Sequence, residues 1–98
     1  MPITITYTNQ DINKYDSFDK IPNFNLVSII NCDNNELTAL PDNMNFPNLK
    51  EFNCSYNQLR FIPDNMNFPN LQKFDCSENQ LRFILDNMNF PNLTLTAL

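Results

Sequence analysis

The chain has 98 residues, a formal net charge of −5 and 42% hydrophobic residues, which is enough for one domain. It contains no Gly and no His, which excludes a glycine-rich phosphate loop and histidine-based catalysis. Its six Lys and Arg residues are scattered singly, so nucleic acid is not an expected partner.

Residues 1–26 have two interpretations. They could form a degenerate first copy of the repeat described next, traced through Ile5, Asn13, Tyr15, Phe18 and Phe24. Alternatively they form an N-terminal cap, in which residues 3–8 are a strand and Ile12, Tyr15 and Phe18 share one side of a short amphipathic turn.

From residue 27 onward the sequence repeats with a period of 22 residues. The hexapeptide Asn-Met-Asn-Phe-Pro-Asn begins at residues 43, 65 and 87. Between its copies stand Cys32, Cys54 and Cys76, each followed three residues later by Asn35, Asn57 or Asn79. A fixed period in this range indicates a repeat architecture.

The middle copy has a recognisable spacing of framework residues, L-x-x-L-x-L-x-x-N-x-L, which resembles the leucine-rich-repeat family. Its residues are Leu49, Phe52, Cys54, Asn57, Leu59 and Ile62; the next copy has Leu71, Phe74, Cys76, Asn79, Leu81 and Ile84, and the previous one has Val27, Ile30, Cys32, Asn35, Leu37 and Leu40. The strand cysteine combined with the hexapeptide is similar to leucine-rich-repeat proteins encoded by giant DNA viruses of amoebae.

This resemblance implies a single leucine-rich-repeat solenoid over residues 1–98, with short parallel β-strands on the concave face and loops and short helical turns on the convex face. The clear repeats are 27–48, 49–70 and 71–92, and a partial terminal repeat is 93–98. The resemblance also implies that Asn35, Asn57 and Asn79 form a structural ladder. We further expect Phe24, Phe46, Phe68 and Phe90 to stack as an aromatic row on the convex side.

No catalytic, cofactor or metal site is expected. Three Cys without His do not make a zinc site or an activated nucleophile, so buried, inert thiols are predicted. The recurring Asp42, Asp64 and Asp86 could in principle hold calcium, but caps on short turns are the favoured interpretation.

The expected function is protein binding through the outward strand face. Strand side chains alternate, so Phe52 and Cys54 point inward while Glu51 and Asn53 point outward. Unlike the framework, the outward residues change from copy to copy, and Ile29 and Tyr56 are the expected anchors. The candidate binding residues are Ile29, Asn31, Asp33, Glu51, Asn53, Tyr56, Lys73, Asp75 and Glu78.

The alternative function is self-assembly through the C-terminal edge. No polar cap follows the last strand, and Leu93, Leu95 and Leu98 bring apolar groups to it, with Leu95 expected on the concave side. A homodimer that joins two such edges is the simplest assembly.

Three features concern the compartment. The odd number of Cys favours a reducing one. Residues 1–11 lack the basic start and apolar stretch of a signal peptide, and no apolar run has the roughly 18 residues of a membrane span. We therefore expect a protein that is not secreted and not in a membrane, located in the cytoplasm, which would be that of the host cell if the protein is viral.

Overall fold

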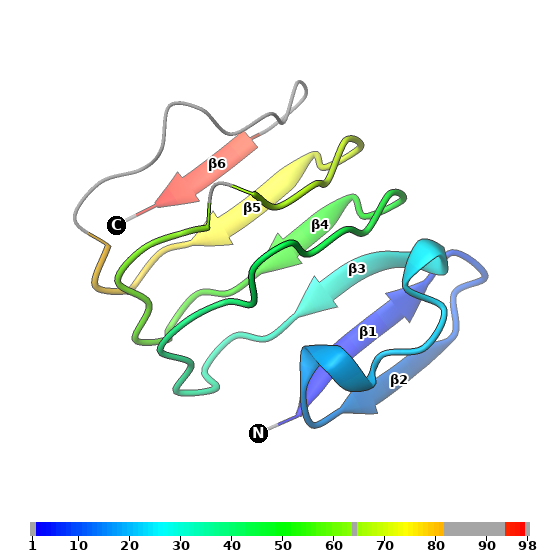
Figure 1. The fold of residues 1–98 in the computed structure, drawn as a ribbon, viewed down its shortest axis with the longest axis horizontal. Helices are drawn as coiled ribbons and strands as arrows, with labels where there is room; N and C mark the ends of the chain where they lie inside the picture. The colour runs from blue at the N-terminus through cyan, green and yellow to red at the C-terminus, as the bar shows by residue number, and fades with distance from the viewer. Residues whose placement is uncertain (1, 64, 82–93, 98) are drawn as a thin grey trace.

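The computed structural model describes residues 2–63, 65–81 and, as backbone only, 94–97. Its centre is one sheet with the strand order β2-β1-β3-β4-β5-β6 (Figure 1). The strands are β1 (Ile3–Tyr7), β2 (Ile12–Tyr15), β3 (Val27–Asn31), β4 (Glu51–Asn53), β5 (Lys73–Cys76) and β6 (Thr94–Ala97). Two 3-10 turns, η1 (Phe18–Lys20) and η2 (Phe24–Leu26), lie between β2 and β3.

The repeats produce the parallel part of the sheet. Ile30 of β3 is in register with Phe52 of β4, which is in register with Phe74 of β5. Each step is one 22-residue period, so equivalent framework residues stack directly on one another. All three of these side chains are buried.

The N-terminal residues do not extend this parallel stack. Strands β1 and β2 form a hairpin, and β1 lies antiparallel to β3 with Ile5 opposite Ile30. Ile3, Ile5 and Tyr7 alternate with half-buried threonines, so one side of β1 joins the core. The hairpin therefore covers the edge of β3 that the first repeat would otherwise leave unpaired.

Between β3 and β4, and again between β4 and β5, the chain returns across one face of the sheet, on the viewer's side in Figure 1. No return segment in residues 2–63 or 65–81 crosses the other face, which we call the outer face (Figure 1). The core between the sheet and the return segments comprises Ile3, Ile5, Tyr7, Ile21, Val27, Ile30, Cys32, Leu40, Met44, Phe46, Leu49, Phe52, Cys54, Leu59, Ile62, Met66, Phe68, Leu71, Phe74 and Cys76.

The predicted fold class, a leucine-rich-repeat solenoid, is wrong. The sheet is mixed instead of purely parallel, and it is open and not curled around a concave face. Its radius of gyration of 12.4 Å is that of a compact globule of this length. In the described part of the repeats the return segments contain turns and an isolated bridge, Asn45 to Asn67, and no helix. Asn and Pro in the hexapeptide explain this, because both disfavour helix interiors.

The predicted asparagine ladder is present and is the main polar support of the stack. The Asn57 side-chain amide donates to the carbonyl oxygens of Cys32 at 3.0 Å and Cys54 at 2.9 Å, and its oxygen accepts from the main-chain N–H of Leu37 at 2.9 Å. Asn79 repeats this one coil later, donating to Cys54 and Cys76 and accepting from Leu59. Each Asn thus joins two coils without any glycine.

The predicted row of phenylalanines is also present among the described residues. Ring centroids are 6.4 Å apart for Phe24 and Phe46 and 6.0 Å apart for Phe46 and Phe68. Phe24 is 52% exposed, so the row is only half-buried at its N-terminal end. Phe90 lies outside the described residues.

The prediction for the C-terminal edge needs one correction. β6 pairs with β5 so that Phe74 is opposite Leu95, an offset of 21 residues instead of 22. The backbone register therefore places Leu95, and not Thr96, opposite Phe74 in the row that continues through Phe52 and Ile30. Leu93 and Leu98 lie outside the described residues.

Candidate binding surface on the outer sheet face

The outer face consists of two rows of side chains that cross the parallel strands. The first row is Ile29, Glu51 and Lys73, and the second is Asn31, Asn53 and Asp75. Each row contains one residue per strand, at the repeat spacing. The antiparallel hairpin continues the face, since Thr6 is opposite Ile29 and Thr4 is opposite Asn31.

These two rows line a shallow hollow of about 570 Å³, which we call the outer hollow. Its remaining lining residues are Ile30, Phe52 and Phe74, whose side chains are buried on the other side of the sheet. The structure therefore brings together six of the nine residues expected to bind a partner: Ile29, Asn31, Glu51, Asn53, Lys73 and Asp75.

The other three predicted residues lie in the loops that follow the strands and do not line the outer hollow. Asp33 is half-buried, and Tyr56 and Glu78 are exposed. Tyr56 is 61% exposed and has φ of 54°, and Glu78 has φ of 55°, both in the left-handed region. Asn34 has the same geometry one copy earlier, with φ of 54°.

One ion pair crosses the outer hollow. Lys73 Nζ lies 3.8 Å from Glu51 Oε1, and the two side chains are 72% and 42% exposed. An exposed pair of this kind contributes little to stability, typically below about 1 kcal/mol. The pair places a positive and a negative group side by side in the outer hollow, next to Ile29, Asn53 and Asp75.

The side chains of the second row also stabilise the turns that follow the strands, a role that was not predicted from the sequence. The side-chain oxygens of Asn31, Asn53 and Asp75 accept from the main-chain N–H two residues later, at 3.1, 3.0 and 3.0 Å. Asn53 and Asp75 also accept from the hydroxyls of Ser55 and Ser77 at 2.6 Å. The signal was present in the sequence as an Asn or Asp two residues before the turn, a common local motif. The first row, Ile29, Glu51 and Lys73, makes no such bonds to the turns in the part of the chain that the structure describes, so its residues are less constrained by the fold.

The three cysteines lie behind this face and offer no chemistry to it. Cys32, Cys54 and Cys76 are free and buried, as the sequence predicted. Burial raises the pKa of Cys32 to about 12 and that of Cys76 to about 11, and the pKa of Cys54 also lies well above its usual value. A thiol that stays protonated is neither a nucleophile nor a metal ligand.

Within residues 2–63 and 65–81 no group of three or more His, Cys, Asp or Glu side chains is arranged to hold a metal ion. Of the acidic row weighed for calcium, Asp42 is exposed, while Asp64 and Asp86 lie outside the described residues.

Comparison of the chain with protein-family models, with curated proteins and with solved structures gives no match. In the part of the chain that the structure describes, no helix is long and apolar enough to cross a membrane.

Proposed function

We propose that the chain is a protein-binding module that recognises a partner through the outer face of β3, β4 and β5. The main support for this proposal is the composition of the outer hollow. Its outward-facing lining residues differ between copies at positions 29, 51 and 73, whereas the buried residues beneath them stay apolar. The framework constrains those buried positions, and the outer residues are free to suit a partner.

The first row offers the mixture of groups that protein interfaces use. Ile29 supplies an apolar contact that is half-buried, and Glu51 and Lys73 supply charges of both signs on adjacent strands. Charged groups at such a surface set specificity and encounter rate more than affinity. The expected partner is a protein surface with a complementary pair of charges beside an apolar group.

Affinity capture from cell lysate with the wild-type chain and two variants tests the proposal. Glu51→Lys combined with Lys73→Glu exchanges the two charges, keeping the net charge and the ion pair while reversing the pattern that a partner meets. The control is Arg60→Glu, an exposed residue on the return segment outside the outer hollow. We expect the specific partner to be lost with the exchanged pair and retained with Arg60→Glu. Equal recovery with all variants would contradict the proposal.

Self-association through β6 is the second candidate, favoured by the position of β6 at one end of the strand order. A strand at a sheet edge offers unpaired main-chain groups to a second chain. Light scattering over a range of concentrations separates the two functions: a mass that stays at 11.5 kDa up to about 100 µM argues against assembly through weak micromolar contacts.

A further inference from the structure

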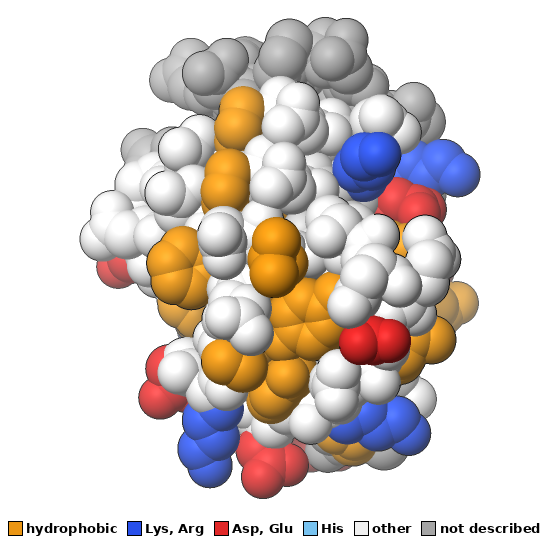
Figure 2. Space-filling model, turned by 90° about the vertical axis from the view of Figure 1, so that its right-hand side faces the viewer, with side chains coloured by type: hydrophobic (Ala, Val, Ile, Leu, Met, Phe, Trp, Pro, Cys, Tyr) orange, Lys and Arg blue, Asp and Glu red, His pale blue; other side chains and the backbone are white. Residues whose placement is uncertain are grey.

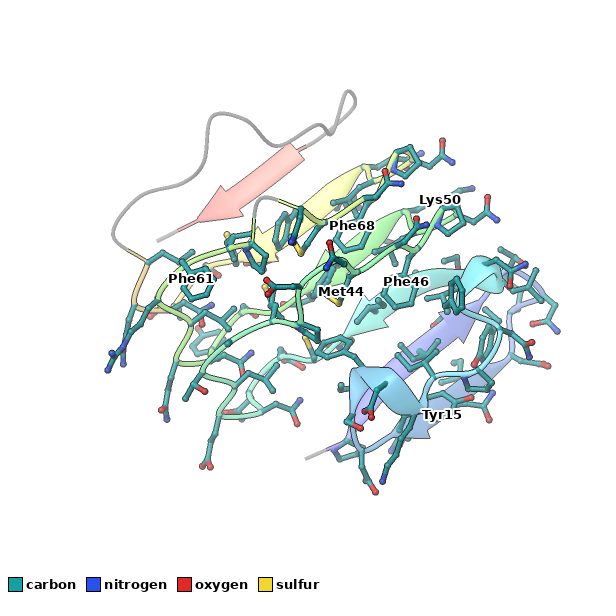
Figure 3. The ribbon with its side chains drawn as sticks, viewed as in Figure 1. Tyr15, Met44, Phe46, Lys50, Phe61 and Phe68 are labelled. Carbon is teal, nitrogen blue, oxygen red and sulfur yellow. The ribbon has the colours of Figure 1, made fainter. Side chains whose placement is uncertain are left out.

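The covered face of the sheet contains a second, larger hollow. This apolar groove has a volume of about 750 Å³ and lies between residues 17–24, which include η1, and the return segment 37–46. Figure 3 shows Met44 and Phe46 on that return segment, which passes beside the η1 coil. Ligand sites for small molecules are typically of about this size and are mostly apolar, with a few polar groups.

Three phenylalanine rings contribute to the apolar groove. Phe24 and Phe46 form an edge-to-face pair, with centroids 6.4 Å apart and ring planes at 87°. Phe18 comes from η1 and is only partly buried. Figure 2, which views the right-hand side of Figure 1 where η2 lies, shows hydrophobic side chains gathered on this surface. Phe24, at 52% exposure, and Leu26, at 46%, are the large exposed hydrophobic residues of η2.

The charged residues that line the apolar groove are both acidic. They are Asp19 and Asp42, and no Lys or Arg belongs to the lining. The ion pair found among the described residues joins Glu51 to Lys73, so neither groove carboxylate has a cationic side chain as partner there. The carboxylates also do not form a metal-binding group with other described side chains.

Asp19 accepts a hydrogen bond from the Ser17 hydroxyl, which leaves Asp42 as the freer carboxylate of the groove. Aromatic rings beside a carboxylate without a cationic partner are the chemistry that recognises organic ammonium ions. The negative face of a phenyl ring attracts a cation, and a nearby carboxylate strengthens that attraction. We propose that the apolar groove is a binding site for a hydrophobic ammonium ion, with its apolar body among Phe18, Phe46 and Met44 and its charged end toward Asp42. Phe24, half-exposed at the groove, supplies a ring to the cationic end.

Titration of the chain with n-octylammonium, 1-octanol and octanoate, followed by NMR of isoleucine methyl groups, tests this site. Ile21 lines the apolar groove and Ile29 lines the outer hollow, so the two signals distinguish the two surfaces. We expect octylammonium to shift Ile21 and not Ile29, and to bind about ten-fold more tightly than octanol. Octanoate should not bind.

Two variants and one control complete the test. Asp42→Asn and Phe24→Leu should each weaken octylammonium binding several-fold and leave octanol binding unchanged. Asp33→Asn removes the same charge outside the apolar groove and should change neither. Equal affinities for octylammonium and octanol would overturn the proposal, as would an equal response of Asp42→Asn and Asp33→Asn. Shifts at Ile21 produced only by a basic amphipathic peptide would also overturn it and assign the groove to a protein partner.

Discussion

The side-chain nitrogen of Asn57 lies 3.0 Å from the main-chain oxygen of Cys32, a residue 25 positions earlier and one coil away. The same amide group holds its own coil through Cys54 and Ser55, and its oxygen accepts from Asn35 and Leu37. One buried side chain thus satisfies main-chain groups of two successive repeats. In a chain without glycine, this is how strands can end in tight turns without leaving buried polar groups unpaired.

The first prediction is that Asn57 is among the most costly polar residues to replace. Asn57→Ala should lower the free energy of unfolding by about 3 kcal/mol, because buried carbonyl and N–H groups lose their partner. Asn57→Asp keeps the size but removes the donors and should cost at least as much. Urea unfolding measures both. The matched control is Asn35→Ala. The Asn35 amide donates to the main-chain oxygen of Asp33 in its own coil, and its bond to the main-chain oxygen of Pro2, just before β1, is long at 3.5 Å. Tolerance of Asn57→Asp within about 0.5 kcal/mol would show that the ladder is unimportant.

The second prediction concerns the left-handed backbone at Tyr56. Asn tolerates this region better than Tyr, and the equivalent residue one copy earlier is Asn34. Tyr56→Asn should therefore raise the free energy of unfolding by about 0.5–1 kcal/mol. Gln58→Asn is the control, because Gln58 is exposed and lies outside the left-handed region. A destabilised Tyr56→Asn variant would mean that the Tyr56 ring makes a contribution that outweighs the backbone strain.

The third prediction compares two phenylalanines of the same row. Phe68 is fully buried and its ring lies 6.0 Å from Phe46 and 5.6 Å from Phe52. Phe68→Ala should cost about 3–5 kcal/mol. Phe24→Ala should cost much less, since the ring is already 52% exposed. Thermal or urea unfolding of the two variants measures the difference, and comparable losses would contradict the packing described above.

The fourth prediction follows from the buried thiols. Their folded-state pKa is raised above the unfolded value, so above about pH 9 the unfolded chain releases protons that the folded chain keeps. The contribution of these thiols to stability is therefore constant below the unfolded pKa and is lost as pH rises toward about 12. Cys32 and Cys54 should each contribute a loss of about 1.4 kcal/mol per pH unit in that window.

Urea unfolding at pH 8 and pH 10 in the presence of a reductant measures this loss. Cys54→Ala lowers stability at pH 8, but it should make the dependence on alkaline pH shallower by about one proton. An unchanged pH dependence in this variant, or native thiols that react with a labelling reagent as fast as in denaturant, would contradict the burial of the cysteines.

The sequence predicted the repeated part of the architecture well. A period of 22 residues and two-residue alternation correctly placed Cys32, Cys54 and Cys76 inward and Glu51 and Asn53 outward. The ladder role of Asn57 and Asn79 was implied by the resemblance to leucine-rich repeats, and their hydrogen bonds agree with it. These features depend on local spacing, which a sequence displays directly.

The sequence did not predict the fold class. The alternation of Ile3, Ile5 and Tyr7 is the same in a parallel and an antiparallel strand, so the direction of β1 was not readable from it. The offset of 21 residues between Phe74 and Leu95 is a second departure, since the repeat spacing of 22 would pair Phe74 with Thr96. The apolar groove joins residues 17–24 with residues 37–46, and no repeat spacing links these two segments.

The most direct test of the outer face as the binding surface is an isoleucine-methyl NMR spectrum of the chain, recorded with the partner that affinity capture identifies. Ile29 is the isoleucine of β3 on the outer face and lines the outer hollow, whereas Ile21 lines the apolar groove on the covered side. If the outer face of β3, β4 and β5 is the binding surface, the Ile29 methyl signal shifts or broadens when the partner is added and the Ile21 signal stays in place. A response at Ile21 with no change at Ile29 would contradict the account.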